Sequence, residues 1–204
     1  MNTKAGGERP RNRRLAILLS GRGSNFESIA ESVRTGAIPR AEIVAVVSDN
    51  PDAAGLGIAR ELGLPATALD RRDSLDRQAH EARVLEVLEA ASPDLVCLAG
   101  YMRLLSPAFV ARFRGRILNI HPSLLPKYPG LEPQQRALNA GDTVAGCTIH
   151  FVDEGTDTGP VILQRTVPIL PGDSAEELSA RILAEEHRAY PAAIAAVLDR
   201  LDPR

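Results

Sequence analysis

The sequence is poor in aromatic and sulfur-containing side chains. Its 204 residues include no tryptophan, two cysteines and only 3% aromatic residues. The two cysteines, Cys97 and Cys147, provide neither a disulfide framework nor the repeated spacing of a zinc site. The scarcity of aromatic residues also argues against a surface on which nucleic-acid bases stack.

An excess of one charge and long apolar runs are missing as well. The net charge is −2 and the pI is about 6.1, which excludes a strongly basic surface for nucleic acid. No run approaches the roughly 18 apolar residues of a membrane helix, and no signal peptide precedes the first expected strand. Because 44% of the residues are hydrophobic, the chain can bury a large core. We expect a cytoplasmic protein that binds neither nucleic acid nor membranes.

The order of the expected elements indicates an α/β fold. Residues 1–13 are polar and non-periodic, which predicts a disordered tail before a single domain at 14–204. Apolar strands alternate with amphipathic helices from residue 15 to about residue 120. The expected strands cover 15–20, 42–49, 66–69 and 93–100, and the expected helices cover 24–33, 53–62 and 76–90. This alternation predicts a doubly wound, mostly parallel sheet.

The pattern changes after residue 120. Two strands at 147–154 and 161–169, separated by the short polar segment 155–160, predict an antiparallel hairpin. The chain then closes with one long helix at 174–198, which Ser174 and Glu177 begin with a strong capping pattern. Pro191 is expected to kink this helix or to begin a second one.

The sequence SGRGSN at residues 20–25 lies between an expected strand and an expected helix. Glycines and the backbone N–H groups of a helix N-terminus form a site for anions there, and Ser24 and Asn25 add donors. A dinucleotide-binding motif would need a third glycine at the position of Phe26, although Asp49 resembles the acid that binds ribose. The turn therefore favours a monophosphate site, with a bare turn and a dinucleotide site as alternatives.

Asn119 and His121 end the strand that starts at Ile117. In an extended strand, residues two apart point to the same face, and open α/β sheets bind ligands at the carboxyl ends of their strands. An amide that donates a hydrogen bond and an imidazole that titrates near neutral pH suit acyl transfer, in which an oxyanion forms while an amine loses a proton. A histidine that only caps the strand is the alternative. The prolines that stiffen the next loop argue against it.

The remaining polar candidates are weaker. Asp157, in DEGTDTGP, is first of all a turn residue, but its carboxylate would lie near the sheet edge if the hairpin packs there. His80 is expected on a solvated helix face and His150 in a structural role. No pair of histidines has the H-E-x-x-H spacing, so we expect no metal site.

Four segments, SGRGSN, LAGYMRLLSP, NIHPSLLPKYPG and HFVDEGTDTGPVILQ, together resemble the phosphoribosylglycinamide formyltransferase family from about residue 15 to residue 198. The resemblance implies a Rossmann-like formyltransferase fold. It also implies transfer of a formyl group from 10-formyltetrahydrofolate to the amine of N1-(5-phospho-D-ribosyl)glycinamide in de novo purine biosynthesis. Further implications are small-molecule partners only, no metal, and a monomer or homodimer.

The resemblance also assigns residues. The half of the chain up to about residue 115 would bind phosphate, and the other half would carry the catalytic residues and the folate cleft. The implied catalytic residues are Asn119, His121 and Asp157. The implied phosphate ligands are Gly23, Ser24 and Asn25, with Glu186 on the ribose. The implied folate-binding residues are Arg77, Met102, Arg103, Leu104, Leu105 and Asn119. The family usually has histidines after YPG, where this chain has the segment 131–135 with Pro133 placed to begin a helix.

Other functions stay open at this stage. A formyltetrahydrofolate deformylase shares the Asn, His and Asp set but usually has an extra N-terminal domain. A methionyl-tRNA formyltransferase would need an RNA-binding domain and a basic surface. An NAD-dependent dehydrogenase would need the missing glycine, and a phosphate-binding module would leave Asn119, His121 and Asp157 without a role.

Overall fold

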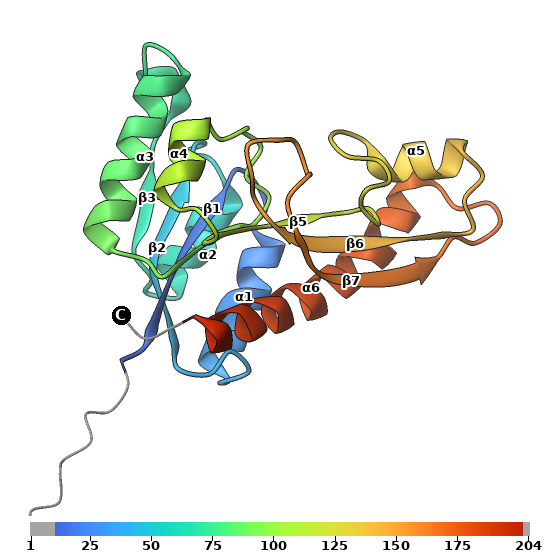
Figure 1. Cartoon of the computed structure of the whole chain (residues 1–204), viewed down its shortest axis with the longest axis horizontal. Coiled ribbons are helices and arrows are strands. Elements are labelled where there is room, and N and C mark those ends of the chain that lie inside the picture. Colours follow the sequence, from blue (N-terminus) through green and yellow to red (C-terminus); the bar gives the residue numbers. More distant parts are fainter. Residues whose placement is uncertain (1–10, 202–204) are drawn as a thin grey trace, which may run out of the picture.

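A computed structural model describes residues 11–201, and in these residues seven strands form one mixed sheet (Figure 1). The strand order is β3-β2-β1-β4-β5-β6-β7. The strands are β1 (Arg13–Leu19), β2 (Ala41–Ser48), β3 (Ala66–Ala68), β4 (Leu95–Leu98), β5 (Ile117–His121), β6 (Val144–Phe151) and β7 (Val161–Pro168). Neighbours among the first five pair in parallel, whereas β6 and β7 pair antiparallel. The predicted doubly wound sheet with a C-terminal hairpin is confirmed.

Helices cover both faces of this sheet. In the described residues they are α1 (Ser24–Arg34), α2 (Ala54–Glu61), α3 (Arg77–Ala91), α4 (Pro107–Arg112), α5 (Pro133–Asn139) and α6 (Ala175–Arg200), with a 3-10 turn η1 at Arg71–Asp73. Alternation along β1 divides the core in two. Leu15, Ile17 and Leu19 pack with α1, α2 and α6, whereas Ala16 and Leu18 pack with α3 and α4. Figure 1 shows α3 and α4 on the opposite side of the sheet from α1 and α6.

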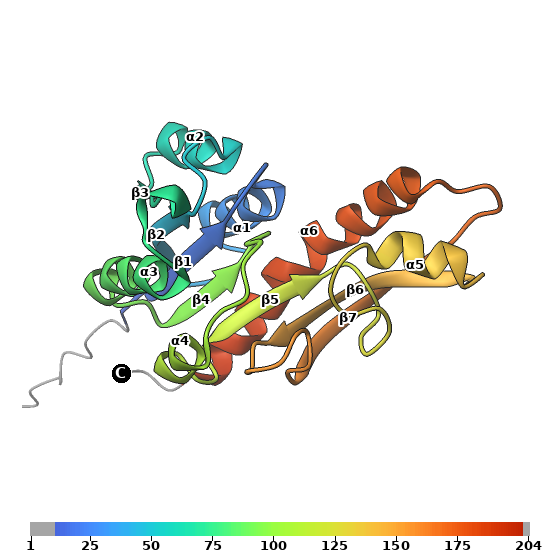
Figure 2. The ribbon, with the colours of Figure 1, turned by 90° about the horizontal axis from the view of Figure 1, so that it is seen from above.

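The last helix is continuous through its proline. α6 has 26 residues, begins with a capping box between Ser174 and Glu177, and contains Pro191 in its interior. The expectation that a second helix begins at Pro191 is wrong. Tyr190 and Ile194, on either side of the proline, are fully buried, so packing against the sheet offsets the missing backbone hydrogen bond. Figure 2 shows α6 running beside β5 and the hairpin.

Several element boundaries differ from those expected. The strand predicted at 93–100 has only four residues, and the hairpin loop spans 152–160 rather than 155–160. The sequence analysis missed α4, although Ser106 caps it and Pro107 occupies its first turn. The prediction of a solvated His80 is wrong, because this side chain is fully buried beneath the segment that follows β4.

The two ends of the chain lie partly outside the described residues, and with them most of the predicted tail. Of its last three residues, Arg11 forms an ion pair with Asp94 at 2.7 Å and Arg13 begins β1. Pro133 begins α5, as the sequence predicted. Between residues 11 and 201, no helix is both long enough and apolar enough to cross a membrane.

Candidate active site

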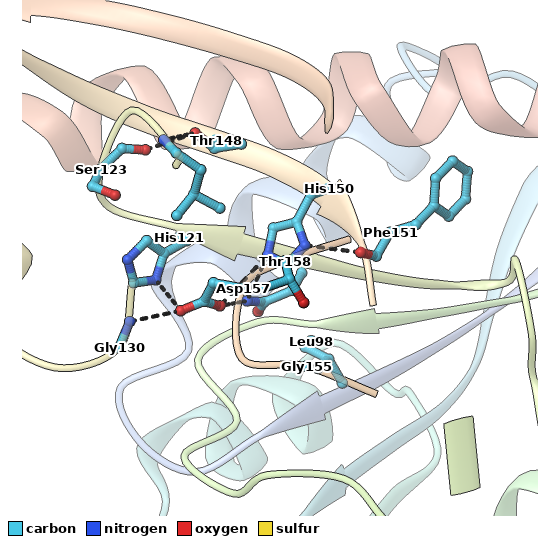
Figure 3. A network of polar contacts seen from close by, with 12 residues as sticks. Leu98, His121, Ser123, Gly130, Thr148, His150, Phe151, Gly155, Asp157 and Thr158 are labelled. Atoms are coloured by element: carbon cyan, nitrogen blue, oxygen red, sulfur yellow. Dashed lines mark hydrogen bonds and ion pairs between the residues drawn. The ribbon is translucent and has the colours of Figure 1, made fainter. Parts of the chain in front are cut away.

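The carboxyl end of β5 brings two side chains to one carboxylate. β5 pairs with β4 on one side and β6 on the other, so its backbone is held across the sheet. Asn119 Nδ2 lies 3.4 Å from Asp157 Oδ1, and His121 Nδ1 lies 3.3 Å from Asp157 Oδ2. Both residues therefore face the same side, and the hairpin loop delivers Asp157 to them. Figure 3 shows Asp157 between His121 and His150.

The loop that carries Asp157 has an unusual backbone. Asp157 has a φ of 55°, in the left-handed region that aspartate tolerates better than most residues. A Cβ on Gly159 would collide with the carbonyl oxygen of Phe151, so the loop closes on β6 only with glycine there. The Gly130 N–H donates to Asp157 Oδ2 at 2.9 Å and anchors the carboxylate to the loop after β5. The pattern DEGTDTGP is a turn, as predicted, and its tip lies at the sheet edge.

The protonation of the two imidazoles follows from their partners. His121 Nε2 lies 2.9 Å from the Tyr128 carbonyl oxygen, which only accepts, so Nε2 carries a proton. The other ring nitrogen, Nδ1, faces Asp157 Oδ2 at 3.3 Å. By the same reasoning His150 Nδ1 donates to the Phe151 carbonyl at 2.8 Å. Its Nε2 lies 3.3 Å from Asn119 Nδ2, on the side of the ring that faces Asp157.

His150 belongs to this cluster, and the interpretation of it as merely structural is wrong. It lies opposite Asn119 in the β5–β6 register, and its Nε2 is 3.6 Å from Asp157 Oδ1. The alternation of side chains along β6 predicts which residues of β6 share a sheet face with His150. It does not predict which residue of β5 lies opposite His150. That choice depends on the strand register, which the sequence alone does not reveal.

The charge of Asp157 is favoured by its neighbours. Burial acts to raise the pKa of this carboxyl, but the contact with His150, the hydrogen bond from the Gly130 N–H and the nearby imidazoles outweigh it. The pKa of Asp157 is therefore below its ordinary value, and the group is an anion at neutral pH. An anion here stabilises positive charge on His121.

The turn after β1 forms the start of α1. Gly23 is the N-cap residue with a φ of 82°, and Ser24 begins the helix. A Cβ on Gly23 would lie 2.6 Å from the Cα of Gly55, so the turn packs directly on the first residues of α2. The sequence analysis missed Gly55, because nothing local indicates which helix backs the turn. The free N–H groups of a helix N-terminus attract anions.

Glu186 of α6 lies next to this turn. Asn25 Nδ2 donates to Glu186 Oε2 at 2.7 Å, although the two residues are 161 positions apart in the sequence. Burial raises the pKa of Glu186, and the hydrogen bond from Asn25 offsets only part of that effect. The structure thus brings together two residues that the sequence assigned to one substrate.

The predicted folate residues follow β4. We call residues 101–106 the strap. Met102 and Leu104 expose 73% and 62% of their surface, unusual values for large apolar residues, and the Met102 N–H donates to Ser20 Oγ at 2.9 Å. Arg77, at the start of α3, pairs with Glu81 at 3.1 Å. Arg103 and Leu105, also of the strap, are half-buried.

The segment that departs from the family pattern begins a helix. Glu132 is the N-cap of α5 with a φ of 52°, and Pro133 follows in the first turn. Gln134 lines a cavity of about 280 Å³ between α5 and the loop after β5. Across residues 11–201 no group of three or more His, Cys, Asp or Glu side chains is placed to hold a metal ion.

The fold and the cluster define a class of α/β protein with an Asn, a His and an Asp at the carboxyl edge of a mostly parallel sheet. Residues 13–194 match the family described as formyl transferase. The chain belongs to the formyl transferase family.

Relatives of known name make the match more specific. Phosphoribosylglycinamide formyltransferase of Escherichia coli strain K12 is 44% identical over 185 residues, which cover 88% of this chain and 84% of the relative. The trifunctional purine biosynthetic protein adenosine-3 of Drosophila melanogaster is 47% identical over 190 residues, or 93% of this chain. These residues make up only 14% of that much longer relative.

A solved structure agrees with the sequence relatives. Glycinamide ribonucleotide transformylase 1 of Symbiobacterium toebii superposes with a TM-score of 0.91 and is 47% identical, with 98% of this chain and 96% of that chain covered. This likeness confirms the formyltransferase fold that the sequence motifs predicted.

Proposed function

We propose that this chain transfers the formyl group of 10-formyltetrahydrofolate to the amine of N1-(5-phospho-D-ribosyl)glycinamide, a step of de novo purine biosynthesis. The observation that carries the proposal is the meeting of Asn119, His121 and Asp157 at one sheet edge. The Escherichia coli relative named for this activity aligns with nearly the whole chain and supports it. The reaction needs only these two small molecules, and we propose the cytoplasm as its location.

The proposed ribonucleotide site is the turn between β1 and α1. Gly23, Ser24 and Asn25 would hold the phosphate with backbone N–H groups at the start of the helix. Glu186 would accept hydrogen bonds from the ribose hydroxyls, and its contact with Asn25 supports placing phosphate and ribose side by side. The glycinamide amine would then extend toward β5.

The proposed folate site is the surface around the strap, which lies before residue 115 in the chain, together with Asn119 of β5. Met102 and Leu104 expose apolar surface on which a flat ring could pack, and Arg103, Leu105 and Asn119 complete the site. Arg77 would bind the acidic tail of the folate, because its guanidinium is half-exposed at the start of α3. Because Glu186 follows residue 115 and Arg77 precedes it, neither proposed site is confined to one half of the chain.

The proposed chemistry is a direct attack without a covalent enzyme intermediate. The amine nitrogen attacks the formyl carbon, and the carbonyl oxygen becomes an oxyanion stabilised by a hydrogen bond from Asn119 and by the positive charge of protonated His121. The contacts of Asn119 Nδ2 with His150 and Asp157 are long, 3.3 and 3.4 Å, so one N–H can turn toward the oxyanion at small cost.

The tetrahedral intermediate then collapses. The bond between the formyl carbon and N10 of the folate breaks, and the electron pair stays on N10. A water held by Asp157 relays a proton from the attacking amine to that nitrogen, which leaves formylated product and tetrahydrofolate. Asp157 also supports His121, because its own pKa is held low and its carboxylate lies 3.3 Å from His121 Nδ1.

The decisive experiment is one assay with 10-formyltetrahydrofolate, with and without the ribonucleotide, that follows the release of tetrahydrofolate. Release that requires the ribonucleotide supports the transfer reaction. Release without it indicates a deformylase-like hydrolase and contradicts the proposal. No release under either condition, with a spectral change on adding a nicotinamide cofactor, would instead indicate a dehydrogenase.

A further inference from the structure

One turn of α3 faces the strap from below. Arg77, His80 and Glu81 are three and four positions apart, so they lie on the same side of the helix. His80 Nε2 lies 3.4 Å from the Tyr101 hydroxyl at one end of the strap. Glu81 contacts the other end, at Ser106. A single helical turn thus holds both ends of the strap.

Glu81 is the junction between this turn and the strap. Its Oε1 accepts the backbone N–H of Ser106 at 2.9 Å and Arg77 Nε at 3.1 Å. The carboxylate is only 6% exposed, whereas the Arg77 side chain is 47% exposed. One buried oxygen therefore fixes both the end of the strap and the base of a guanidinium that reaches solvent.

The Arg77 geometry leaves its functional end available. Glu81 contacts Nε, so the two terminal nitrogens of the guanidinium point away from it. The terminal nitrogens of a guanidinium can form two parallel hydrogen bonds to one carboxylate, which is bidentate binding. A ligand with a flat apolar body and a carboxylate tail would pack on Met102 and Leu104 and reach Arg77.

We propose that Glu81 is a positioning residue for the folate: by holding Ser106 and Arg77 together, it sets the distance between the surface for the ring and the guanidinium for the acidic tail. The inference rests on the proposed function, because it takes the strap and Arg77 as the folate site. It adds a residue that touches neither substrate.

Two substitutions separate the two contacts. Glu81→Ala removes both, and we expect the KM for 10-formyltetrahydrofolate to rise about tenfold, as for a lost charge-assisted hydrogen bond. The KM for the ribonucleotide and the kcat should stay within about twofold, because the reacting groups are untouched. Glu81→Gln keeps an oxygen for Ser106 but not the charge that holds Arg77, so its KM should rise only about threefold.

A shortened cosubstrate isolates the Arg77 contact. The primary amide of 10-formyltetrahydropteroic acid lacks the carboxylates of the glutamate tail, so Arg77 has no anion to bind. With this substrate Glu81→Gln should behave as the wild type, whereas Glu81→Ala should still have a raised KM because the strap has moved. Hydrogen exchange at the Ser106 amide should be faster in Glu81→Ala and unchanged in Glu81→Gln.

Glu89 provides the matched control. It lies on the same helix and also bridges to α4, through Arg112 at 2.8 Å, but it is exposed and distant from the strap. Glu89→Ala should leave both KM values unchanged. If Glu81→Ala raised both KM values equally, or neither, the positioning role would be wrong. If Glu81→Ala fails to fold, Glu81→Gln tests the role instead: its KM should be raised with the full cosubstrate and not with the shortened one.

The proposed function can fail separately from this inference. A wild type that releases no tetrahydrofolate with the ribonucleotide present refutes the transfer reaction. The dissociation constant of tetrahydrofolate, measured by titration for wild type and variants, then still tests Glu81. Weaker binding in Glu81→Ala than in Glu89→Ala supports the role, and equal binding or no binding by the wild type overturns it.

Discussion

Asn25 Nδ2 donates a 2.7 Å hydrogen bond to Glu186 Oε2, a contact that joins α1 to α6 across 161 positions of sequence. Phosphate and ribose are adjacent in a ribonucleotide, and these two residues were assigned to them separately from sequence motifs. Their contact supports the proposal that one site binds both groups. Glu186 is buried, so its charge would affect how strongly it accepts hydrogen bonds from a bound ribose.

Glu186→Gln tests this buried acid through the pH dependence of stability. Burial raises the pKa of Glu186 above its ordinary 4.5, so the acid stabilises the fold below pH 4.5 and loses that contribution as pH rises through the folded-state value. In the variant, the glutamine at position 186 has no carboxyl group to ionise. We therefore expect the free energy of unfolding of the wild type to fall relative to the variant above pH 4.5. Urea unfolding at a series of pH values measures this, and parallel curves would refute it.

Asp157→Asn should reduce turnover at least about a hundredfold, because it removes the anion that supports His121 and the proton relay. Asparagine also tolerates the left-handed backbone at this position, so the fold should be kept. Turnover and a thermal unfolding curve together check the prediction. Near-normal turnover in a folded variant would exclude Asp157 from the chemistry.

His121→Ala should cost a similar factor, about a hundredfold or more, through the loss of oxyanion stabilisation. The change should appear mainly in kcat, because the ribonucleotide and folate contacts lie elsewhere. Steady-state kinetics with each substrate varied in turn makes the distinction. A loss confined to KM would assign His121 to binding instead.

Gly55→Ala should weaken ribonucleotide binding from behind the turn. The new Cβ would lie 2.7 Å from Leu19 Cδ2 and 3.2 Å from the Cα of Gly23, so the turn must shift. Gly57→Ala is the control, because it lies in the same helix with open space around it. We expect a raised KM for the ribonucleotide only in the first variant, and a stability gain of about 0.5–1 kcal/mol in the second. Equal KM values would show that the turn does not depend on Gly55.

Tyr190→Phe tests the hydroxyl that joins the strands behind the site. This buried hydroxyl lies 3.1 Å from the carbonyl oxygen of Leu98 and 3.0 Å from that of Leu118, the residue before Asn119. Its loss should cost about 1–3 kcal/mol, because buried carbonyl groups lose their donor. Tyr128→Phe, which removes a less buried contact with Asp142, should cost less. Chemical denaturation compares them, and a larger effect at Tyr128 would contradict the argument.

The parts of the site that could be predicted from the sequence are those with a local signal. Asn119 and His121 are two residues apart in a strand, so their shared face follows from the strand period. Ser24 follows a glycine-rich turn between strand and helix, and Pro133 fits the first turn of a helix. In each case the backbone of a few neighbouring residues is enough to decide the outcome.

The parts that could not be predicted depend on distant packing. His150 reaches Asp157 only because β6 pairs with β5 in one register, and a shift by one residue would point it away. His80 was expected in solvent, but the segment after β4 covers it. Pro191 was expected to kink the last helix or to begin a second one, yet α6 is continuous through it, with buried residues on both sides.

The amino-acid sequence by itself determined the α/β order of elements, the glycine-rich turn between β1 and α1, and the residue types that could catalyse an acyl transfer. It could do so because helix and strand periods, caps and turns depend on residues close together in the chain. The tertiary structure alone decided that Asp157 meets His121, that Asn25 meets Glu186, and that Glu81 joins Arg77 to the strap. These contacts form only when strand pairing and helix packing bring distant segments within hydrogen-bonding distance.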